Sequence, residues 1–162
     1  MQGDPIVAAW AESFRAGGDG DVLPPHSPGC VGCGPGNPHG LGLVVRREGD
    51  SVVAEHTFDA RHAGAPGVAH GGTVAMAFDD LFGFVLYLVG ELAVTRDLQV
   101  SYLAPVRLDT PYVLRARYGE RVGRRIPVSG QLHRADGTVI AAAAATFVIV
   151  DTEHFTRAAG PA

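Results

Sequence analysis

The sequence predicts an α+β domain in which an antiparallel sheet wraps around one long central helix. Three observations support this prediction. Residues 73–89 have strong helical periodicity, two β-prone runs precede them, and four strand-like runs follow them, divided by short turn signals. The 162 residues, 46% of them hydrophobic, suit one compact domain.

The N-terminal part is predicted to be a short helix followed by an irregular lead-in. Ile6, Trp10 and Phe14 are four residues apart, so residues 5–16 are expected to form an amphipathic helix with one packed stripe. From Gly17 to Gly40 the chain is rich in Gly, Pro and Asp. Glycine costs backbone entropy and proline lacks an N–H donor, so this stretch is predicted to be a connecting loop.

Two β-prone runs come next, Leu41–Arg47 and Ser51–Phe58. They are separated by Glu48-Gly49-Asp50, where the glycine can adopt the positive φ of a hairpin turn. The two strands are therefore predicted to pair antiparallel.

The central helix follows a Gly-rich stretch. Its apolar residues repeat at helical spacing along one face: Val74, Phe78, Leu81, Val85 and Leu88. The window from Thr73 to Val89 is barely long enough to span a bilayer, and it carries Asp79 and Asp80, each of which would cost about 3 kcal/mol near the middle of a membrane. We therefore expect a buried helix and no membrane association.

The pattern after Gly90 has a period of two. Leu98, Val100 and Tyr102 alternate with Asp97, Gln99 and Ser101, which predicts a half-buried strand. Three further runs complete a predicted meander of antiparallel strands joined by short turns: Tyr112–Val122, Arg125–His133 and Thr138–Val150. We expect a lead-in over 1–40, the folded domain over 41–150, and a frayed tail over 151–162.

Charge and the N-terminal sequence exclude some functions. The chain has 13 basic residues, all Arg, and 17 acidic ones, so the formal net charge of −4 offers no basic stripe for nucleic acid. Met1–Pro5 does not begin a secretory signal, so a cytoplasmic location is expected.

The start of the central helix is a candidate site for chemistry. Gly71 and Gly72 would leave the first helical N–H groups uncovered, and these donors together with the helix dipole can stabilise an oxygen that carries negative charge. Such a helix start can serve as an oxyanion hole, although Gly-Gly alone is more typical of a flexible helix start.

Two carboxylates inside the apolar helix also need an explanation, because a buried carboxylate is costly without a partner. Asp79 shares a side with Met76 and Gly83, and the absent side chain of Gly83 would leave room for a ligand beside it. Asp80 is turned about 100° away and is expected to be solvated or paired with an Arg.

These features together resemble a known family. The residues that carry the resemblance are His70-Gly71-Gly72, Asp79, Thr95, Tyr102-Leu103-Ala104-Pro105, and the earlier Cys30, Cys33, Gly34, Asn37, Pro38, Gly40 and Leu41. From about Cys30 to Val150 the chain is similar to the hotdog-fold acyl-CoA thioesterases of the phenylacetate-pathway and 4-hydroxybenzoyl-CoA thioesterase-like superfamily.

The resemblance implies an acyl-CoA substrate and specific roles, without a cofactor or metal. His70 and Gly71 would polarise the thioester carbonyl, with the Gly71 amide as oxyanion donor. Asp79 would activate water or attack directly, and Thr95 would help position the water. Substrate contacts are expected from Gly72, Gly83 and Met76.

Helix geometry adds a constraint on the assembly. Gly71 and Asp79 are eight residues apart on one helix, which separates them by about 12 Å at 1.5 Å per residue. Both cannot touch one thioester carbon, so a site that uses both must combine two chains. We therefore predict a homodimer, or a homotetramer, with shared active sites.

Two other functions fit parts of the pattern. A hotdog protein could bind an acyl thioester without cleaving it, but a binder has no need for Asp79. The segment from His62 to Gly67 faintly resembles the hotdog dehydratases, whose His works with a helix acid closer to it than Asp79 is to His62. His56 and His133 alternate within strands and are given no role.

Two further groups of residues could bind a metal ion or phosphate. His26, Cys30, Cys33 and His39 could supply four zinc ligands, although a tight turn with free thiols explains the same residues and the predicted site contains no metal. Four arginines could contact the phosphates of coenzyme A or be solvated surface residues: Arg96, Arg107, Arg124 and Arg125.

Overall fold

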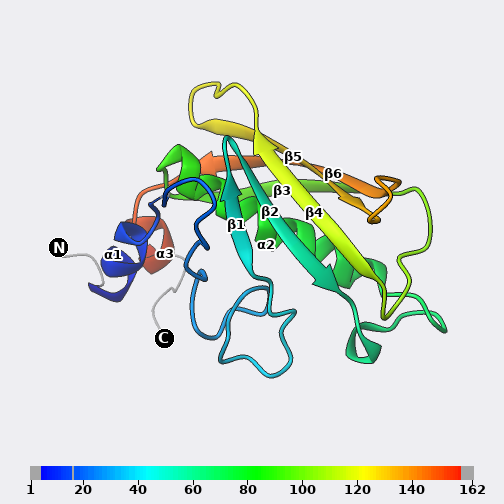
Figure 1. Cartoon of the computed structure of the whole chain (residues 1–162). Helices are drawn as coiled ribbons and strands as arrows, with labels where there is room; N and C mark the ends of the chain where they lie inside the picture. Colours follow the sequence, from blue (N-terminus) through cyan, green and yellow to red (C-terminus); the bar gives the residue numbers. More distant parts are fainter. Residues whose placement is uncertain (1–4, 16, 158–162) are drawn as a thin grey trace.

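The computed structural model describes residues 5–15 and 17–157. They form a six-stranded antiparallel sheet that curves around one long helix, α2, with two short helices together at one end of the molecule (Figure 1). In chain order the elements are α1 (Pro5–Glu12), β1 (Val45–Glu48), β2 (Ser51–Thr57), η1 (Ala60–His62), α2 (Gly71–Val89), β3 (Ala93–Tyr102), β4 (Pro111–Tyr118), β5 (Arg125–His133), β6 (Val139–Ile149) and α3 (Glu153–Arg157). The predicted fold class is confirmed.

Both ends of α2 are set by local sequence. His70 has an extended backbone, and its Nδ1 accepts a hydrogen bond from the Gly72 N–H at 2.9 Å, which caps the helix. Gly90 ends the helix in the left-handed conformation, φ 71°, which glycine adopts with little strain.

The core lies between α2 and the concave face of the sheet. Phe78, Leu81 and Phe82 are fully buried. A Cβ on Gly130 of β5 would lie 2.7 Å from the Phe82 ring, so this glycine lets the sheet approach the helix closely. Although α2 is long and apolar enough to cross a membrane, about half of its residues, including Phe78, Leu81 and Val85 of the predicted apolar face, are buried in this core.

The order of the strands differs from the predicted four-stranded meander. The sheet order is β1-β2-β4-β5-β6-β3, so β4, β5 and β6 form a meander and β3 pairs with β6 instead of β4. The expectation of a continuous meander is wrong because β4 pairs with β2 from the hairpin, which leaves β3 at the far edge of the sheet. A register irregularity interrupts β3 between Thr95 and Asp97.

Two predicted strands are too long. β1 begins at Val45 instead of Leu41, because Leu41 and Leu43 donate their backbone hydrogen bonds to loop carbonyls of Val31 and Gly32. β4 ends at Tyr118 instead of residue 122. Buried leucines can therefore produce a strand-like pattern in a loop that packs on the core.

The chain ends pack against each other more than the sequence suggests. α1 ends at Glu12, short of the predicted residue 16, which lies outside the described residues, as do residues 1–4 and 158–162. Phe14 is buried, whereas Ile6 is 77% exposed, so the predicted stripe is only partly packed. Phe155 of α3 contacts Trp10 with ring centroids 5.1 Å apart, so the expectation of a frayed tail is wrong for α3.

Candidate active site

Asp79 and Thr95 come together beside the middle of α2. The Thr95 hydroxyl, on β3, donates a hydrogen bond to Asp79 Oδ1 at 2.8 Å. Both residues line a hollow of about 240 Å³ whose other walls include the apolar side chains of Trp10, Phe14 and Phe147. The hollow thus holds a positioned carboxylate in a mainly apolar setting, which suits proton transfer beside an acyl group.

The helix start presents one free amide. The Gly72 N–H is engaged by the His70 side chain, and the Tyr102 hydroxyl donates to the Gly71 carbonyl at 2.5 Å. Within the described part of the chain, the Gly71 N–H donates to no other group. Of the two glycines, Gly71 is therefore the one whose amide is available to an incoming oxygen.

One chain does not bring these two groups together. Gly71 and Asp79 lie on the same helix, so about 12 Å of helix axis separates them. The hollow around Asp79 is lined by neither His70, Gly71 nor Gly72. Met76 also lies outside that hollow and packs, half-buried, against the core.

Asp80 has a different environment from the one expected. Its side chain is only 7% exposed, and its Oδ1 lies 3.0 Å from His26 Nδ1 and 3.2 Å from Cys30 Sγ. The expectation that Asp80 is solvated or paired with an Arg is wrong, because the lead-in before β1 folds over it. The sequence held a signal for this: no basic residue lies three or four positions from Asp80 on the helix.

The same segment fills the space beside Gly83. A Cβ on Gly83 would lie 2.8 Å from His26 Cε1 and Nε2, so the imidazole occupies the space that a side chain would take. Gly83 nevertheless lines the hollow that holds Asp79, and its contact with a substrate stays a prediction. Burial, the Asp80 carboxylate and the neighbouring Cys30 raise the pKa of the Cys33 thiol well above its usual range.

His39 does not join this cluster. It is exposed, and its backbone N–H donates to Asn37 Oδ1 at 3.0 Å. The cluster consists instead of His26, Cys30, Cys33 and Asp80. The ligand set considered from the sequence is thus wrong in one member, because Asp80 lies 50 residues beyond Cys30 in the chain.

The other histidines lie in structural positions. His62 is buried and takes part in the capping box of η1, where its Nδ1 accepts a hydrogen bond from the Asp59 N–H at 3.2 Å. Burial and the neighbouring His62 lower the pKa of His56 to about 4, so its imidazole is neutral at pH 7. A helix cap accounts for His62 without a catalytic role.

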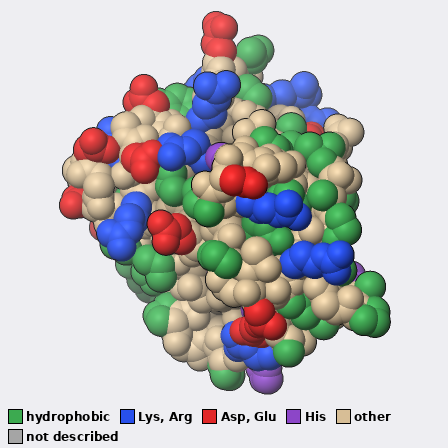
Figure 2. Space-filling model, turned by 45° about the vertical axis from the view of Figure 1, so that its right-hand side comes forward, with side chains coloured by type: hydrophobic (Ala, Val, Ile, Leu, Met, Phe, Trp, Pro, Cys, Tyr) green, Lys and Arg blue, Asp and Glu red, His purple; other side chains and the backbone are tan. Residues whose placement is uncertain are grey.

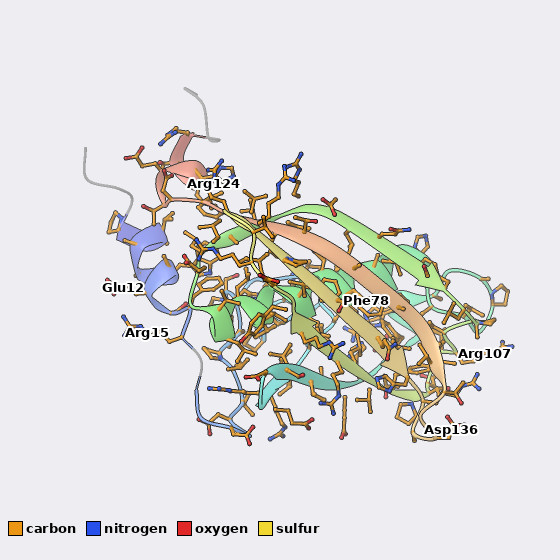
Figure 3. The ribbon with its side chains drawn as sticks, turned by 90° about the horizontal axis from the view of Figure 1, so that it is seen from above. Glu12, Arg15, Phe78, Arg107, Arg124 and Asp136 are labelled. Atoms are coloured by element: carbon orange, nitrogen blue, oxygen red, sulfur yellow. The ribbon has the colours of Figure 1, made fainter. Side chains whose placement is uncertain are left out.

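The arginines considered for phosphate binding do not form one group. Arg107 and Arg124 lie at opposite ends of the molecule, with Phe78 of α2 between them (Figure 3). On the face seen in Figure 2, acidic, basic and hydrophobic side chains are interspersed. Arg107 and Arg124 therefore cannot act together on one phosphate group within a chain.

Comparisons with known proteins agree with the observed fold. The family model described as Thioesterase superfamily matches residues 66–141, a range that includes His70, Asp79 and Thr95. A search of curated proteins gives no significant match.

Solved structures give close matches in fold. A thioesterase superfamily protein is 30% identical, with a TM-score of 0.68 over 71% of this chain and 60% of that protein. A protein from Ralstonia eutropha JMP134, described as a thioesterase related to phenylacetic acid degradation, is 25% identical, with a TM-score of 0.60 over 67% of this chain and 86% of that one. A protein from Streptococcus pneumoniae TIGR4, described as a hypothetical thioesterase and solved with coenzyme A, is 20% identical, with a TM-score of 0.60 over 62% and 82% of the two chains.

Residues 66–141 thus match the thioesterase superfamily, and the sheet wrapped around α2 is the hotdog fold of its solved members, so the resemblance inferred from the motifs is confirmed. The chain spans only 60% of the length of the first of these solved proteins. Thioester hydrolysis is the general activity of this superfamily.

Proposed function

We propose that this protein hydrolyses an acyl-CoA thioester to a free acid and coenzyme A. The observation that carries the proposal is the Thr95 to Asp79 hydrogen bond on the wall of an open, mainly apolar hollow. A thioester hydrolase needs a carboxylate that is positioned by a hydroxyl beside a space that suits an acyl chain. A protein that only binds the thioester does not need such a carboxylate. The coenzyme A bound to the solved Streptococcus pneumoniae protein supports the choice of thiol.

In the proposed mechanism Asp79 acts as general base. It takes a proton from a water held with Thr95, and the resulting hydroxide attacks the thioester carbonyl carbon. The Gly71 N–H stabilises the oxyanion of the tetrahedral intermediate. When the intermediate collapses, the carbon–sulfur bond breaks and coenzyme A leaves as a thiolate, which takes up a proton.

Asp79 can alternatively act as the nucleophile. Its carboxylate would attack the thioester carbon, release the thiolate and form a mixed anhydride, which water then hydrolyses to regenerate Asp79. The same residues serve both routes. Hydrolysis in ¹⁸O-labelled water under single-turnover conditions tests for the nucleophilic route. If water attacks the Asp79 carbonyl carbon of the anhydride, the label enters the Asp79 carboxylate and the product acid is unlabelled, whereas the general-base route places the label in the product acid.

The proposal requires two copies of the chain. Since Gly71 and Asp79 are about 12 Å apart on α2, the oxyanion donor comes from a second protomer. The edge strand β3, which carries Thr95, has one side without a partner strand in the described chain, and such an edge favours pairing with another chain. A homodimer is the smallest assembly that completes the site, and a tetramer built from two such dimers would contain the same site.

The test is thiol release from a panel of acyl-CoAs that covers short, long and aryl acyl groups. Asp79→Asn and Asp79→Ala are expected to lower kcat by about 10²–10⁴-fold, the usual contribution of a positioned general base. Asp50→Asn, which changes an exposed carboxylate in the turn between β1 and β2, is the matched control and is expected to keep wild-type activity.

Three outcomes would contradict the proposal. Near-normal hydrolysis by either Asp79 variant would remove Asp79 from the mechanism. Binding of several acyl-CoAs by the wild-type protein without turnover of any of them would favour the non-hydrolytic binding function instead. Turnover of a β-hydroxyacyl-CoA to an enoyl-CoA without thiol release would favour the dehydratase function.

A further inference from the structure

Four metal-binding side chains converge next to the candidate active site. His26, Cys30 and Cys33 come from the lead-in before β1, and Asp80 comes from α2. Asp80 Oδ1 lies 3.0 Å from His26 Nδ1 and 3.2 Å from Cys30 Sγ, and Cys33 Sγ lies 3.4 Å from His26 Nδ1. All four donor atoms lie within 4.8 Å of one another.

The cluster is buried but its polar atoms are incompletely satisfied. The side chain of Asp80 is 7% exposed and that of His26 is 15% exposed. Asp80 Oδ2 and His26 Nε2 are both buried without a hydrogen-bond partner. A carboxylate this deeply buried normally has a cation or several donors around it, and the described residues place no Arg in contact with Asp80.

Glycines make the space for these four side chains. A Cβ on Gly32 would lie 2.1 Å from Asp80 Cγ, and a Cβ on Gly83 would lie 2.8 Å from the His26 ring. On the far side, the His26 ring packs against Phe84 with ring centroids 4.2 Å apart. Any side chain at Gly32 or Gly83 would displace a member of the cluster, so the surrounding backbone is shaped around it.

The donor set and spacing suit a tetrahedral zinc ion. Zinc bonds of about 2.3 Å to sulfur and about 2.0–2.1 Å to nitrogen and oxygen place tetrahedral ligand atoms about 3.3–3.8 Å apart. Three of the six donor pairs, at 3.0, 3.2 and 3.4 Å, are slightly shorter, and the other pairs lie within 4.8 Å. A bound zinc ion would therefore move some ligands outward by a few tenths of an ångström and draw the more distant pairs inward by up to about one ångström. Two sulfurs with one nitrogen favour zinc over magnesium or calcium, which prefer oxygen ligands.

We propose that His26, Cys30, Cys33 and Asp80 bind a structural zinc ion that fastens the N-terminal lead-in to α2. Four protein ligands complete the tetrahedral shell and leave no position for a reacting water, which is the pattern of a structural site. The ion would join residues 54 positions apart in the chain. It would act with the hydrogen bond from the Tyr87 hydroxyl to the Pro24 carbonyl, 3.0 Å, which fastens the same segment to the same helix.

The proposed zinc ligands differ from the proposed hydrolytic residues, although His26 and Asp80 line the same hollow as Asp79 and Thr95. Asp80 follows Asp79 directly, but consecutive residues on a helix point about 100° apart. Asp79 bonds to Thr95, whereas Asp80 faces His26 and Cys30. The Asp79→Asn variant is therefore expected to keep its zinc, so loss of activity and loss of metal can be told apart.

The first experiment is elemental analysis of the full chain, purified under reducing conditions and without a metal-affinity tag. About one zinc per chain is expected. After removal of the metal with a chelator, addition of Co²⁺ is expected to produce thiolate-to-cobalt charge-transfer absorption, which only sulfur ligation gives. Less than a tenth of an equivalent of zinc, together with no such absorption on Co²⁺ titration, would overturn the proposal. A Cys30–Cys33 disulfide in protein purified without reductant, with no metal uptake after its reduction, would do the same.

Variants identify the ligands. Cys33→Ser and Asp80→Asn, which nearly preserve side-chain size, are expected to reduce bound zinc from about one equivalent to about a tenth or less. His39→Ala is the matched control, because His39 is exposed in the same segment but outside the cluster, and it is expected to keep full zinc. Full zinc in Asp80→Asn, or lost zinc in His39→Ala, would show that the ligand set is wrong. The Co²⁺ spectrum of the wild-type protein keeps the proposal testable if a variant fails to fold.

Discussion

The shared active site can be tested by mixing two inactive variants. Gly71→Pro removes the one N–H that is proposed to stabilise the oxyanion, and Asp79→Asn removes the base. Gly71 is the first residue of α2, where proline is well tolerated because its missing N–H has no helical partner. The preceding His70 already has the extended backbone that a following proline requires, φ −62° and ψ 133°.

The expected loss of activity in Gly71→Pro follows from the loss of one hydrogen-bond donor. Loss of one oxyanion-hole donor costs about 10²–10³-fold in kcat. Gly71→Ala is the matched control, because it adds the same Cβ, 3.4 Å from the Tyr102 ring, but keeps the N–H. Gly71→Ala should therefore lose far less activity than Gly71→Pro, and all variants should keep a wild-type thermal unfolding midpoint to within a few degrees.

The assay is thiol release by hybrid dimers. Two different affinity tags allow the Gly71→Pro/Asp79→Asn heterodimer to be isolated after co-expression. If each site combines Gly71 of one protomer with Asp79 of the other, the heterodimer has one intact site and one doubly altered site, and about half of the wild-type activity returns. If each site used Gly71 and Asp79 of the same chain, both sites would stay altered. A purified heterodimer no more active than its parents would refute the shared-site argument.

Three further predictions follow from single contacts. Thr95→Val removes the hydroxyl that donates to Asp79 at 2.8 Å, so kcat for thiol release should fall about tenfold without loss of thermal stability, and an unchanged kcat would contradict the role of that contact. Gly83→Ala places a Cβ 2.8 Å from the His26 ring and should lower the free energy of unfolding in urea by about 1–3 kcal/mol, whereas an unchanged value would mean that the ring moves aside freely. Because burial lowers the pKa of His56 to about 4, the unfolded chain binds a proton there below about pH 6.5 that the folded chain binds only near pH 4. The free energy of unfolding in urea should therefore fall by up to roughly 3 kcal/mol as the pH drops from about 6.5 to about 4. His56→Gln should make the free energy of unfolding depend less on pH over this range.

Elements whose signals are local were predictable from the sequence. β5 was predicted with the bounds that it has, and α2 was predicted to within two residues, because helical periodicity, a capping residue and Gly90 define it without reference to the rest of the chain. The β1–β2 hairpin was predictable because its turn residues and both strands are adjacent.

Features that depend on distant segments were not predictable in this way. The position of β3 at the sheet edge follows from β2 pairing with β4, a choice between surfaces that no local pattern encodes. Leu41 and Leu43 looked like strand residues, yet they are buried in a loop whose backbone bonds to Val31 and Gly32. Periodicity reports that a side chain is buried, but it does not report which backbone covers it.

The surroundings of the two adjacent carboxylates of α2 also depend on distant segments and could not be predicted from local patterns. A helix fixes only that Asp79 and Asp80 point about 100° apart, and the sequence says nothing about what lies in each direction. For Asp79 the neighbour is Thr95, 16 residues away, which the family motif supplied. For Asp80 the neighbours are His26 and Cys30, at least 50 residues away, and no spacing rule for metal ligands reaches that far.

The two carboxylates also explain why the N-terminal lead-in belongs to the site. Trp10 and Phe14 line the hollow that holds Asp79, but α1 has no buried residue of its own to anchor it. The contacts that hold this wall in place run through Phe14, which stacks on Tyr87 with ring centroids 4.8 Å apart, and through His26, which reaches Asp80. Asp80 and His26 line the same hollow as Asp79. In the proposed mechanism Asp79 acts on the thioester, whereas Asp80 holds the wall of the hollow in place, so a change at Asp80 should alter substrate selection before it alters the chemical step.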